Sequence, residues 1–545
     1  MKPGIKISLY SLIFLAAVSC GKENLVEPAP PKVLRSIAVE EETITLSTGK
    51  THELHFVVDE AGFSFDLSRD VVLYNTSSQA PSAFSLQSVR QDGADGRYCA
   101  VVQDNSSGSD YSLQVRLGIR LESGKEIFLF SSLFTIRGED AGLHGVSLHT
   151  GLPTVYLDTE ASAPIVSKEN FLTAALSIRN AGEWNVDELS CQVRGRGNTT
   201  WWWPKKPYLI KLDKKAPVLG MPKHKRWVLL ANFLDRTLMR NLVAMRVASF
   251  TRLDWTPRCQ SVELVLNGKH QGTYLLIEQV RVDNDRVPIT EMTAEDNDGE
   301  ALTGGYLLES DFHYDNLVQW MDPHGGTVQW GSNSGIPFGI KYPDEDEITP
   351  QQLNYIKQYI YDTAEALYGE NFTDPEEGYA KYIDVDSFVD YWIVFEVMGN
   401  HELGNPGSVF THKDRGGKLK AGPCWDFDWG VLSYNTSPQA RTGLINGHAI
   451  WYNRLFQDPA FREKVRIRFQ ELLPRLETIP AYMEELEEQL EASAKLNFGM
   501  WNPAEDASMN GGRIINGDEN MSFHSAVERI KSIYEDRLTV IPKNL

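Results

Sequence analysis

The chain has 545 residues, of which 53 are Lys or Arg and 74 are Asp or Glu, so its formal net charge is −21. Hydrophobic residues make up 42% and charged residues 23%, values that are typical of a folded chain and exclude an intrinsically disordered one. At about 100–200 residues per domain the length predicts two to four domains. The acidic balance argues against a nucleic-acid-binding protein, which needs a basic face.

The N-terminus has the pattern of an export signal. Lys2 and Lys6 precede a short apolar run at 7–18, which is too short to span a bilayer at ~20 residues per crossing. Residues 1–19 are therefore predicted to be a signal peptide. A small residue followed by Cys20 resembles a bacterial lipoprotein box, which implies lipid on the Cys20 sulfur; the alternative is an ordinary signal peptide with an incidental cysteine.

Residues 20–34 contain three prolines, Pro28, Pro30 and Pro31, and are predicted to form a semi-rigid tether. No later segment is apolar enough to cross a membrane. We therefore expect a protein of the cell envelope that contacts the membrane through its lipid anchor only; the resemblance to bacterial lipoproteins implies the outer membrane of a Gram-negative bacterium.

Four cysteines remain after Cys20: Cys99, Cys191, Cys259 and Cys424. No two of them form a CxxC pair, which argues against a zinc site. An exported protein permits disulfides, and a Cys191–Cys259 bridge is conceivable. Unrelated buried thiols are the favoured interpretation.

Residues 35–140 are predicted to form a β-sandwich of the immunoglobulin-like type. Alternating apolar residues mark strands at 37–46, 53–58, 85–89, 98–102, 111–117 and 127–136, and turn signals such as Asp92-Gly93 separate them. No constellation of His, Cys or carboxylate side chains stands out in this region. It is therefore interpreted as a spacer or adhesion module.

A linker at 138–145 precedes a second predicted domain at 146–545. Its first half is β-rich, with strands expected at 174–178, 189–194, 208–212, 262–266, 272–278 and 305–309 and one helix at 235–250. Its second half is helical, with helices expected at 349–368, 386–398, 481–496 and 526–538. This order predicts an α+β domain of two lobes with a cleft between them.

The first candidate for chemistry is the loop that begins at Arg194 and leads into a strand that carries Lys206 and Lys211. Gly195 and Gly197 alternate with Arg196 and Asn198 in this loop, and a glycine-rich loop exposes backbone N–H groups that bind phosphate oxygens. The alternative is a hairpin with aromatic packing and solvated lysines.

The second candidate is Glu402, in a turn directly after an apolar helix. A carboxylate on a loop that a packed element positions suits a general base or a metal ligand. The alternative is a helix-terminal turn in which Glu402 accepts backbone hydrogen bonds. His401 and His412 lie nearby but lack the spacing of a zinc site, and both are interpreted as structural.

The third candidate is the pair Asp426 and Asp428, which lie two residues apart among bulky apolar residues. On a strand these side chains share a face and would converge on one cation. Buried carboxylates are costly unless a charge pairs with them, and Mg²⁺ prefers a few carboxylates plus substrate phosphates. The alternative is a pair of turn-capping aspartates.

These motifs, in this order, resemble the CotH kinase family, the atypical kinases typified by spore coat protein H, in a Bacteroides-type lipoprotein version. The resemblance covers about 152–538. The blocks that carry it are RGRGNTTW at 194–201, PKKPY at 204–208, LLAN at 229–232, DRTLMRN at 235–241, NGKHQGTYLL at 267–276, GGYLLE at 304–309 and GKLKAGPCWDFDWG at 417–430.

The resemblance implies a divergent two-lobed protein-kinase-like fold that binds ATP between a β-rich and a helical lobe. It implies Lys206, or else Lys211, as the lysine that contacts the nucleotide phosphates, with Arg196, Gly197 and Asn198 beside it.

By the same resemblance Asp426 is the aspartate that binds Mg²⁺ or Mn²⁺, with Asp428 as its neighbour. Glu402 occupies the position where the family usually has a catalytic aspartate. Asn405 or Ser408 falls near its metal-binding asparagine, and Ser408 is our choice as a metal ligand.

The sequence therefore favours an exported, lipid-anchored kinase that transfers the ATP γ-phosphate to a hydroxyl of a protein acceptor. One alternative is a non-catalytic surface lipoprotein that uses the same scaffold to bind a glycan or a partner protein. The other is a metal-dependent glycosyltransferase, in which an Asp-x-Asp pair holds a nucleotide sugar.

Overall fold

The structure is a computed structural model of the whole chain. The residues it describes are 37–40, 43–47, 51–58, 71–75, 84–93, 97–104, 110–120, 126–131, 134–139, 143–144, 146, 148–312, 318–322, 335–404, 406–503 and 515–545. The predicted signal peptide, the tether, Cys20 and Asn405 lie outside these residues.

The N-terminal region forms two β-sheets. One has the strand order β1-β3-β6-β5 and the other β2-β9-β7-β4, with β8 paired to β7. The strands are β1 (Ile37–Val39), β2 (Thr43–Ser47), β3 (Thr51–Val58), β4 (Val71–Asn75), β5 (Phe84–Gln91), β6 (Arg97–Asp104), β7 (Asp110–Arg120), β8 (Glu126–Phe130) and β9 (Phe134–Glu139).

The predicted strands of this region are present, but two runs that the alternation treats as single strands are each divided. The run at 37–46 is divided between β1 and β2, which belong to different sheets, and the run at 127–136 is divided between β8 and β9. Leu54, Phe56 and Val58 are buried while the residues between them are more exposed, as the period-two pattern requires. The immunoglobulin-like sandwich itself stays a prediction.

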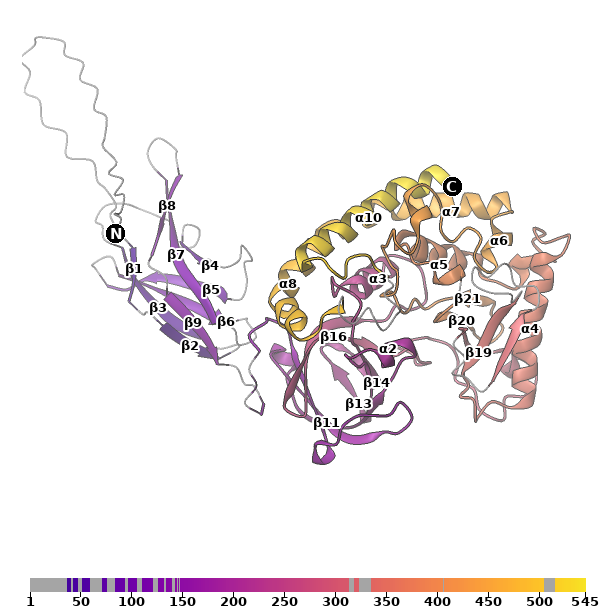
Figure 1. The fold of residues 1–545 in the computed structure, drawn as a ribbon, viewed down its shortest axis with the longest axis horizontal. Coiled ribbons are helices and arrows are strands. Elements are labelled where there is room, and N and C mark those ends of the chain that lie inside the picture. Colours follow the sequence, from indigo (N-terminus) through magenta and orange to yellow (C-terminus); the bar gives the residue numbers. More distant parts are fainter. Residues whose placement is uncertain are drawn as a thin grey trace, which may run out of the picture.

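A closed barrel follows, with the strand order β10-β11-β12-β13-β14-β16-β15 (Figure 1). Its strands are β10 (Thr154–Thr159), β11 (Leu172–Arg179), β12 (Val186–Gly195), β13 (Tyr208–Val218), β14 (Met221–Leu230), β15 (Cys259–Leu266) and β16 (Lys269–Glu278). Parallel pairing of β10 with β15 closes it. The short helix α2 (Thr199–Trp202) joins β12 to β13, and α3 (Arg240–Ala248) joins β14 to β15.

A second sheet lies beyond the barrel in the chain, with the order β18-β19-β17-β20-β21. Its strands are β17 (Tyr306–Ser310), β18 (Gln319–Asp322), β19 (Ile336–Tyr342), β20 (Val409–Lys413) and β21 (Leu419–Ala421). The helices in this half of the chain are α4 (Pro350–Tyr368), α5 (Val385–Val397), α6 (Tyr452–Leu455), α7 (Pro459–Leu476), α8 (Ile479–Met500) and α10 (Phe523–Asn544). Figure 1 shows α8 and α10 running along one side of this part of the molecule, with α8 reaching the barrel.

Local sequence explains where the central helices begin. Thr349 caps α4 in a reciprocal capping box with Gln352, and Pro350 occupies the first helical position. Asp384 caps α5 by accepting a hydrogen bond from the Ser387 N–H. Helix α5 is buried from Ser387 to its end, so packing surrounds the helix after its first turn.

Several sequence expectations need correction. The helix expected at 235–250 begins only at Arg240, because Asp235 and the residues after it form hydrogen-bonded turns. The helix α7 was not predicted from the sequence. The β-rich half is a closed barrel, and the two-lobed protein-kinase arrangement stays a prediction. The four cysteines that the structure describes are free thiols, as favoured.

None of the helices in the described part of the chain combines the length and the apolar character needed to cross a bilayer.

Candidate functional site

The segment that carries Asp426 and Asp428 follows β21 and is an irregular loop, not a strand. The strand geometry that the sequence analysis used to bring the pair together is therefore wrong. The pair still meets, because Asp426 adopts a left-handed backbone conformation with φ of 64° and its side chain shares a hydrogen bond with that of Asp428. A non-glycine residue in this conformation is uncommon and draws attention to the loop.

Two buried asparagines hold this loop in place. Asn241, on α3, accepts a hydrogen bond from the Phe427 N–H at 2.8 Å. Asn516 accepts one from the Gly430 N–H at 2.8 Å and donates to the Asp428 carbonyl at 3.1 Å. The loop therefore has its backbone groups satisfied from two distant parts of the chain, which fixes the aspartates without regular structure.

A buried ion-pair network lies beneath the loop. The Arg240 guanidinium contacts the carboxylates of Asp235 and Asp518, all three side chains being fully buried. Its Nε donates to the Val431 carbonyl at 2.8 Å. Arg240 thus connects the turn before α3, the aspartate loop and the segment before α10.

Glu402 lies in a short 3₁₀ turn (Glu402–Gly404) just after α5. Its N–H donates to the Asn400 Oδ1 at 2.9 Å, and the Asn446 side chain donates to the Asn400 carbonyl at 2.8 Å. The Oε2 atom of Glu402 is buried and has no hydrogen-bond partner among the residues that the structure describes. A buried acceptor without a partner is unusual in proteins, and a hydrogen-bond donor or a cation bound there would satisfy it.

Five carboxylates form what we call the acidic cluster: Glu309, Asp311, Glu402, Asp426 and Asp428. Burial raises the pKa of Glu402 well above its usual range, and Asp426, Asp428 and Asp311 raise it further by repulsion. Burial and Asp426 raise the pKa of Asp428 in the same way. The cluster therefore carries more negative charge than its surroundings balance.

Two cations lie against this cluster. Burial lowers the pKa of Arg196, whereas the negative charges of Asp426, Glu309 and Asp428 act to raise it, so Arg196 lies within electrostatic range of these carboxylates. Lys341, on β19, forms an ion pair with Glu309 at 2.6 Å. Both positive groups lie where negatively charged phosphate oxygens would also be attracted.

The other residues predicted to bind a nucleotide lie in different surroundings. Lys206 donates to the Trp201 carbonyl at 2.8 Å and lies over the Trp201 ring. Lys211 stands on β13 between Gln192 and Arg226 in the strand register. Within the described residues, neither lysine makes a hydrogen bond or an ion pair with a member of the acidic cluster. Their assignment stays a prediction.

The glycine-rich loop is packed against its own helix. A Cβ on Gly195 would lie 2.3 Å from the Trp201 ring, and one on Gly197, which has φ of 84°, would lie 2.0 Å from the Thr200 hydroxyl. Asn198 precedes α2 and makes no side-chain cap. These glycines are needed for close approach within the loop, and a phosphate-binding role stays a prediction.

The predicted ligand Ser408 lies at the acidic cluster, where its side chain hydrogen-bonds to Glu309. Glu309, Asp311 and Lys341 are members of the site that sequence reasoning missed. A signal was present: Glu309 and Asp311 have the same two-residue spacing as Asp426 and Asp428. Lys341 carries no comparable local pattern, because it reaches Glu309 through antiparallel pairing of β17 with β19.

Two of the solved structures that match this chain are surface proteins of low sequence identity. Domains 5–6 of the S-layer protein SbsC match with 13% identity, cover 36% of this chain and 95% of that one, and give a TM-score of 0.14. The Escherichia coli adhesin FdeC matches with 10% identity, covers 57% of this chain and 90% of that one, and gives a TM-score of 0.17. TM-scores this low support no conclusion about fold or function. No curated protein matches the chain.

The family model for the CotH kinase protein matches residues 193–541. The match begins on β12 of the barrel and ends near the end of α10, so it contains Arg196 and every member of the acidic cluster. It confirms the resemblance that the motifs indicate and covers well over half of the chain. The chain therefore belongs to the CotH kinase family.

Proposed function

We propose that this protein is an exported, lipid-anchored kinase that transfers the ATP γ-phosphate to a hydroxyl group of a protein acceptor. The observation that carries the proposal is the acidic cluster, in which Asp426, Asp428 and Asp311 repel the buried charge of Glu402 and one Glu402 oxygen is buried without a hydrogen-bond partner among the described residues. Family membership supports a kinase-like protein.

The donor set fits a hard divalent cation. Asp426 and Asp428 share a hydrogen bond, which two carboxylates make only when a proton lies between them, and a cation would replace that proton. Mg²⁺ or Mn²⁺ bound by these two residues would neutralise charge on the transferring phosphate. Ser408 contributes through its bond to Glu309 and is expected to help position that carboxylate.

Arg196 and Lys341 are the cations we assign to the nucleotide phosphates. Arg196 interacts with Asp426 and Asp428 and can present two N–H groups to one phosphate. Lys341 pairs with Glu309, so its ammonium is held in a fixed place at the cluster. Phosphoryl transfer depends mainly on positioning and charge neutralisation, and these residues supply both.

We assign Glu402 as the base that takes the proton from the acceptor hydroxyl. In its ionised form its carboxylate accepts the hydroxyl proton while the acceptor oxygen bonds to the γ-phosphorus and the bond from that phosphorus to ADP breaks. Its turn is fixed by Asn400 and Asn446, which gives the carboxylate a defined direction. A well-placed base of this kind contributes about 10²–10⁴-fold to the rate.

Cys20 is the proposed lipidation site, and the cell envelope the proposed location. The supporting feature is the signal-like segment at 1–19 followed by Cys20. Metabolic labelling with a fatty-acid analogue tests this assignment, and Cys20→Ala should lose the label.

The direct test of catalysis is transfer of radiolabelled γ-phosphate from ATP in the presence of Mg²⁺ to proteins of the cell envelope. Wild type should label an acceptor and Glu402→Gln should not, although both bind ATP. If neither labels an acceptor and neither binds ATP, the scaffold interpretation holds. If stabilisation by a sugar nucleotide exceeds stabilisation by ATP, the glycosyltransferase interpretation holds.

A further inference from the structure

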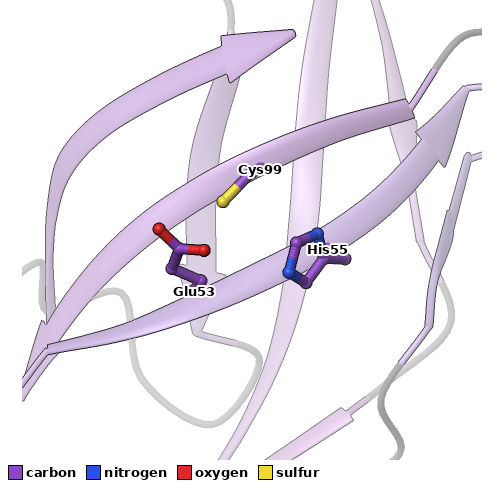
Figure 2. A group of neighbouring side chains, drawn as sticks. All are labelled: Glu53, His55 and Cys99. Atoms are coloured by element: carbon purple, nitrogen blue, oxygen red, sulfur yellow. The ribbon is translucent and has the colours of Figure 1, made fainter. Parts of the chain in front are cut away.

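A second group of ligand-type side chains lies in the N-terminal sheets, outside the matched family region. Glu53 and His55 stand on β3, and Cys99 stands on the neighbouring strand β6 (Figure 2). One ligand atom from each of the three side chains lies within 4.8 Å of the others. Among the residues that the structure describes, no other trio of His, Cys, Asp or Glu side chains meets this condition.

The strand register explains why the three meet. His55 and Cys99 are directly paired across the antiparallel strands β3 and β6. Glu53 lies two residues before His55, so both side chains point to the same face of the sheet. Cross-strand pairing therefore brings together ligands that are far apart in the sequence, which explains why spacing motifs do not reveal them.

The surroundings orient the histidine as a metal ligand. Asp92 Oδ2 lies 3.3 Å from His55 Nδ1, so Asp92 can hold a proton on Nδ1 and leave the lone pair on Nε2. Carboxylate–histidine pairs of this kind set the tautomer of metal-binding histidines. Figure 2 shows the His55 ring turned along the sheet toward the side on which Glu53 and Cys99 lie.

The cysteine and the carboxylate interact directly. Cys99 is fully buried and its thiol hydrogen-bonds to the Glu53 carboxylate. A divalent ion bound between them would displace the thiol proton to solvent. Arg90 Nη2 bonds to Glu53 Oε1 at 2.9 Å, which holds the carboxylate in place beside Cys99.

We propose that Glu53, His55 and Cys99 form a Zn²⁺ site that ties β3 to β6. Sulfur, imidazole and carboxylate ligands together favour Zn²⁺ over Mg²⁺ or Ca²⁺. Three protein ligands leave a fourth tetrahedral position for water. This site is independent of the proposed kinase function, since none of its residues belongs to the acidic cluster.

The test uses the full-length protein, freed of metal, with Co²⁺ as a spectroscopic substitute for Zn²⁺. Wild type should develop a thiolate-to-Co²⁺ charge-transfer band that Zn²⁺ then abolishes, and Cys99→Ser should lack it. Glu53→Gln, at an exposed position that tolerates change, should weaken Zn²⁺ binding at least tenfold. Asp92→Asn should weaken it by about 10–100-fold, the usual effect of removing the group that orients a ligand.

Two matched variants separate this site from others. Cys424→Ser removes the thiol two residues from Asp426, and His52→Gln changes a histidine on the opposite face of β3; both should keep the band. The proposal is overturned if wild type gives no thiolate band or if Cys424→Ser loses the band. It is also overturned if Glu53→Gln and Cys99→Ser bind Zn²⁺ as tightly as wild type.

Discussion

At the scale of single residues, Glu402 is the residue on which the proposed catalysis depends. Its Oε2 is buried without a partner in the described residues, while its backbone is fixed by Asn400. Burial and the neighbouring carboxylates favour the protonated form of Glu402, so the proposed base is ionised only when a bound cation offsets the charge of its neighbours.

Replacing Glu402 by Gln keeps the size of the side chain and removes its ability to accept a proton. We expect the rate of γ-phosphate transfer to fall about 10²–10⁴-fold while the affinity for ATP changes little. Single-turnover kinetics and nucleotide titration measure the two separately. Glu463→Gln, on the exposed side of α7, is the control and should leave both unchanged. Equal loss of binding and transfer would show that Glu402 holds the nucleotide instead.

The candidate residues were only partly predictable from the sequence. Asp426 and Asp428 were named on the basis of strand geometry, yet they converge through a left-handed residue at Asp426. Glu309 and Lys341 meet only because β17 pairs with β19, a contact between distant segments. Residue type and spacing identify chemistry, whereas long-range pairing decides which candidates meet.

At the scale of elements, the aspartate loop depends on Arg240. Removing one partner of a buried ion pair leaves an uncompensated charge, and Arg240 pairs with both Asp235 and Asp518. Arg240→Met should therefore lower the free energy of unfolding by about 3–5 kcal/mol, measured by urea denaturation. Arg466→Met, which removes a half-exposed pair with Glu463, should change it by less than about 1 kcal/mol.

Lys205 joins α8 to the barrel. Its ammonium donates to the Thr273 carbonyl and, at 2.8 Å, to the Asn497 Oδ1, and it is 1% exposed. Burial lowers the pKa of Lys205 to about 7. The unfolded chain therefore binds more protons than the folded one between pH 7 and the ordinary lysine value, so this residue makes stability rise with pH over that window.

Lys205→Met should remove this dependence. Between pH 7 and 9 the stability of wild type should rise relative to that of Lys205→Met by up to about 1.4 kcal/mol per pH unit. Chemical denaturation at three pH values measures the difference. The control is Lys225→Met, at an exposed position on β14, whose free energy of unfolding should change with pH as that of wild type does. A constant difference between wild type and Lys205→Met would mean that Lys205 stays charged in the folded protein.

Regular elements with strong local signals were predictable. The helix α4 begins after its capping box at Thr349, and α5 follows its Asp384 cap, both close to the expected positions. The barrel was not predictable, because its closure depends on the parallel pairing of β10 with β15, two strands that lie more than one hundred residues apart in the sequence. Periodicity predicts strands, whereas it does not determine their partners.

At the scale of the whole molecule, the N-terminal sheets stand beside the barrel and helices in Figure 1. Within the described residues, no strand from β1 to β9 packs broadly against an element from β10 onward. Domains with small interfaces unfold independently. We therefore expect two calorimetric transitions. Zn²⁺ should raise the midpoint temperature of one, and ATP with Mg²⁺ should raise the midpoint temperature of the other. A single transition that both ligands raise would contradict this division.

Calorimetric titration of a non-hydrolysable ATP analogue in Mg²⁺ is the sharpest test of whether Asp426 and its neighbours bind a cation together with ATP. Wild type should bind one equivalent, and Asp426→Ala should remain folded and lose the Mg²⁺-dependent part of the affinity. Equal binding by wild type and Asp426→Ala, or no binding by wild type at any Mg²⁺ concentration, would rule out the proposed site.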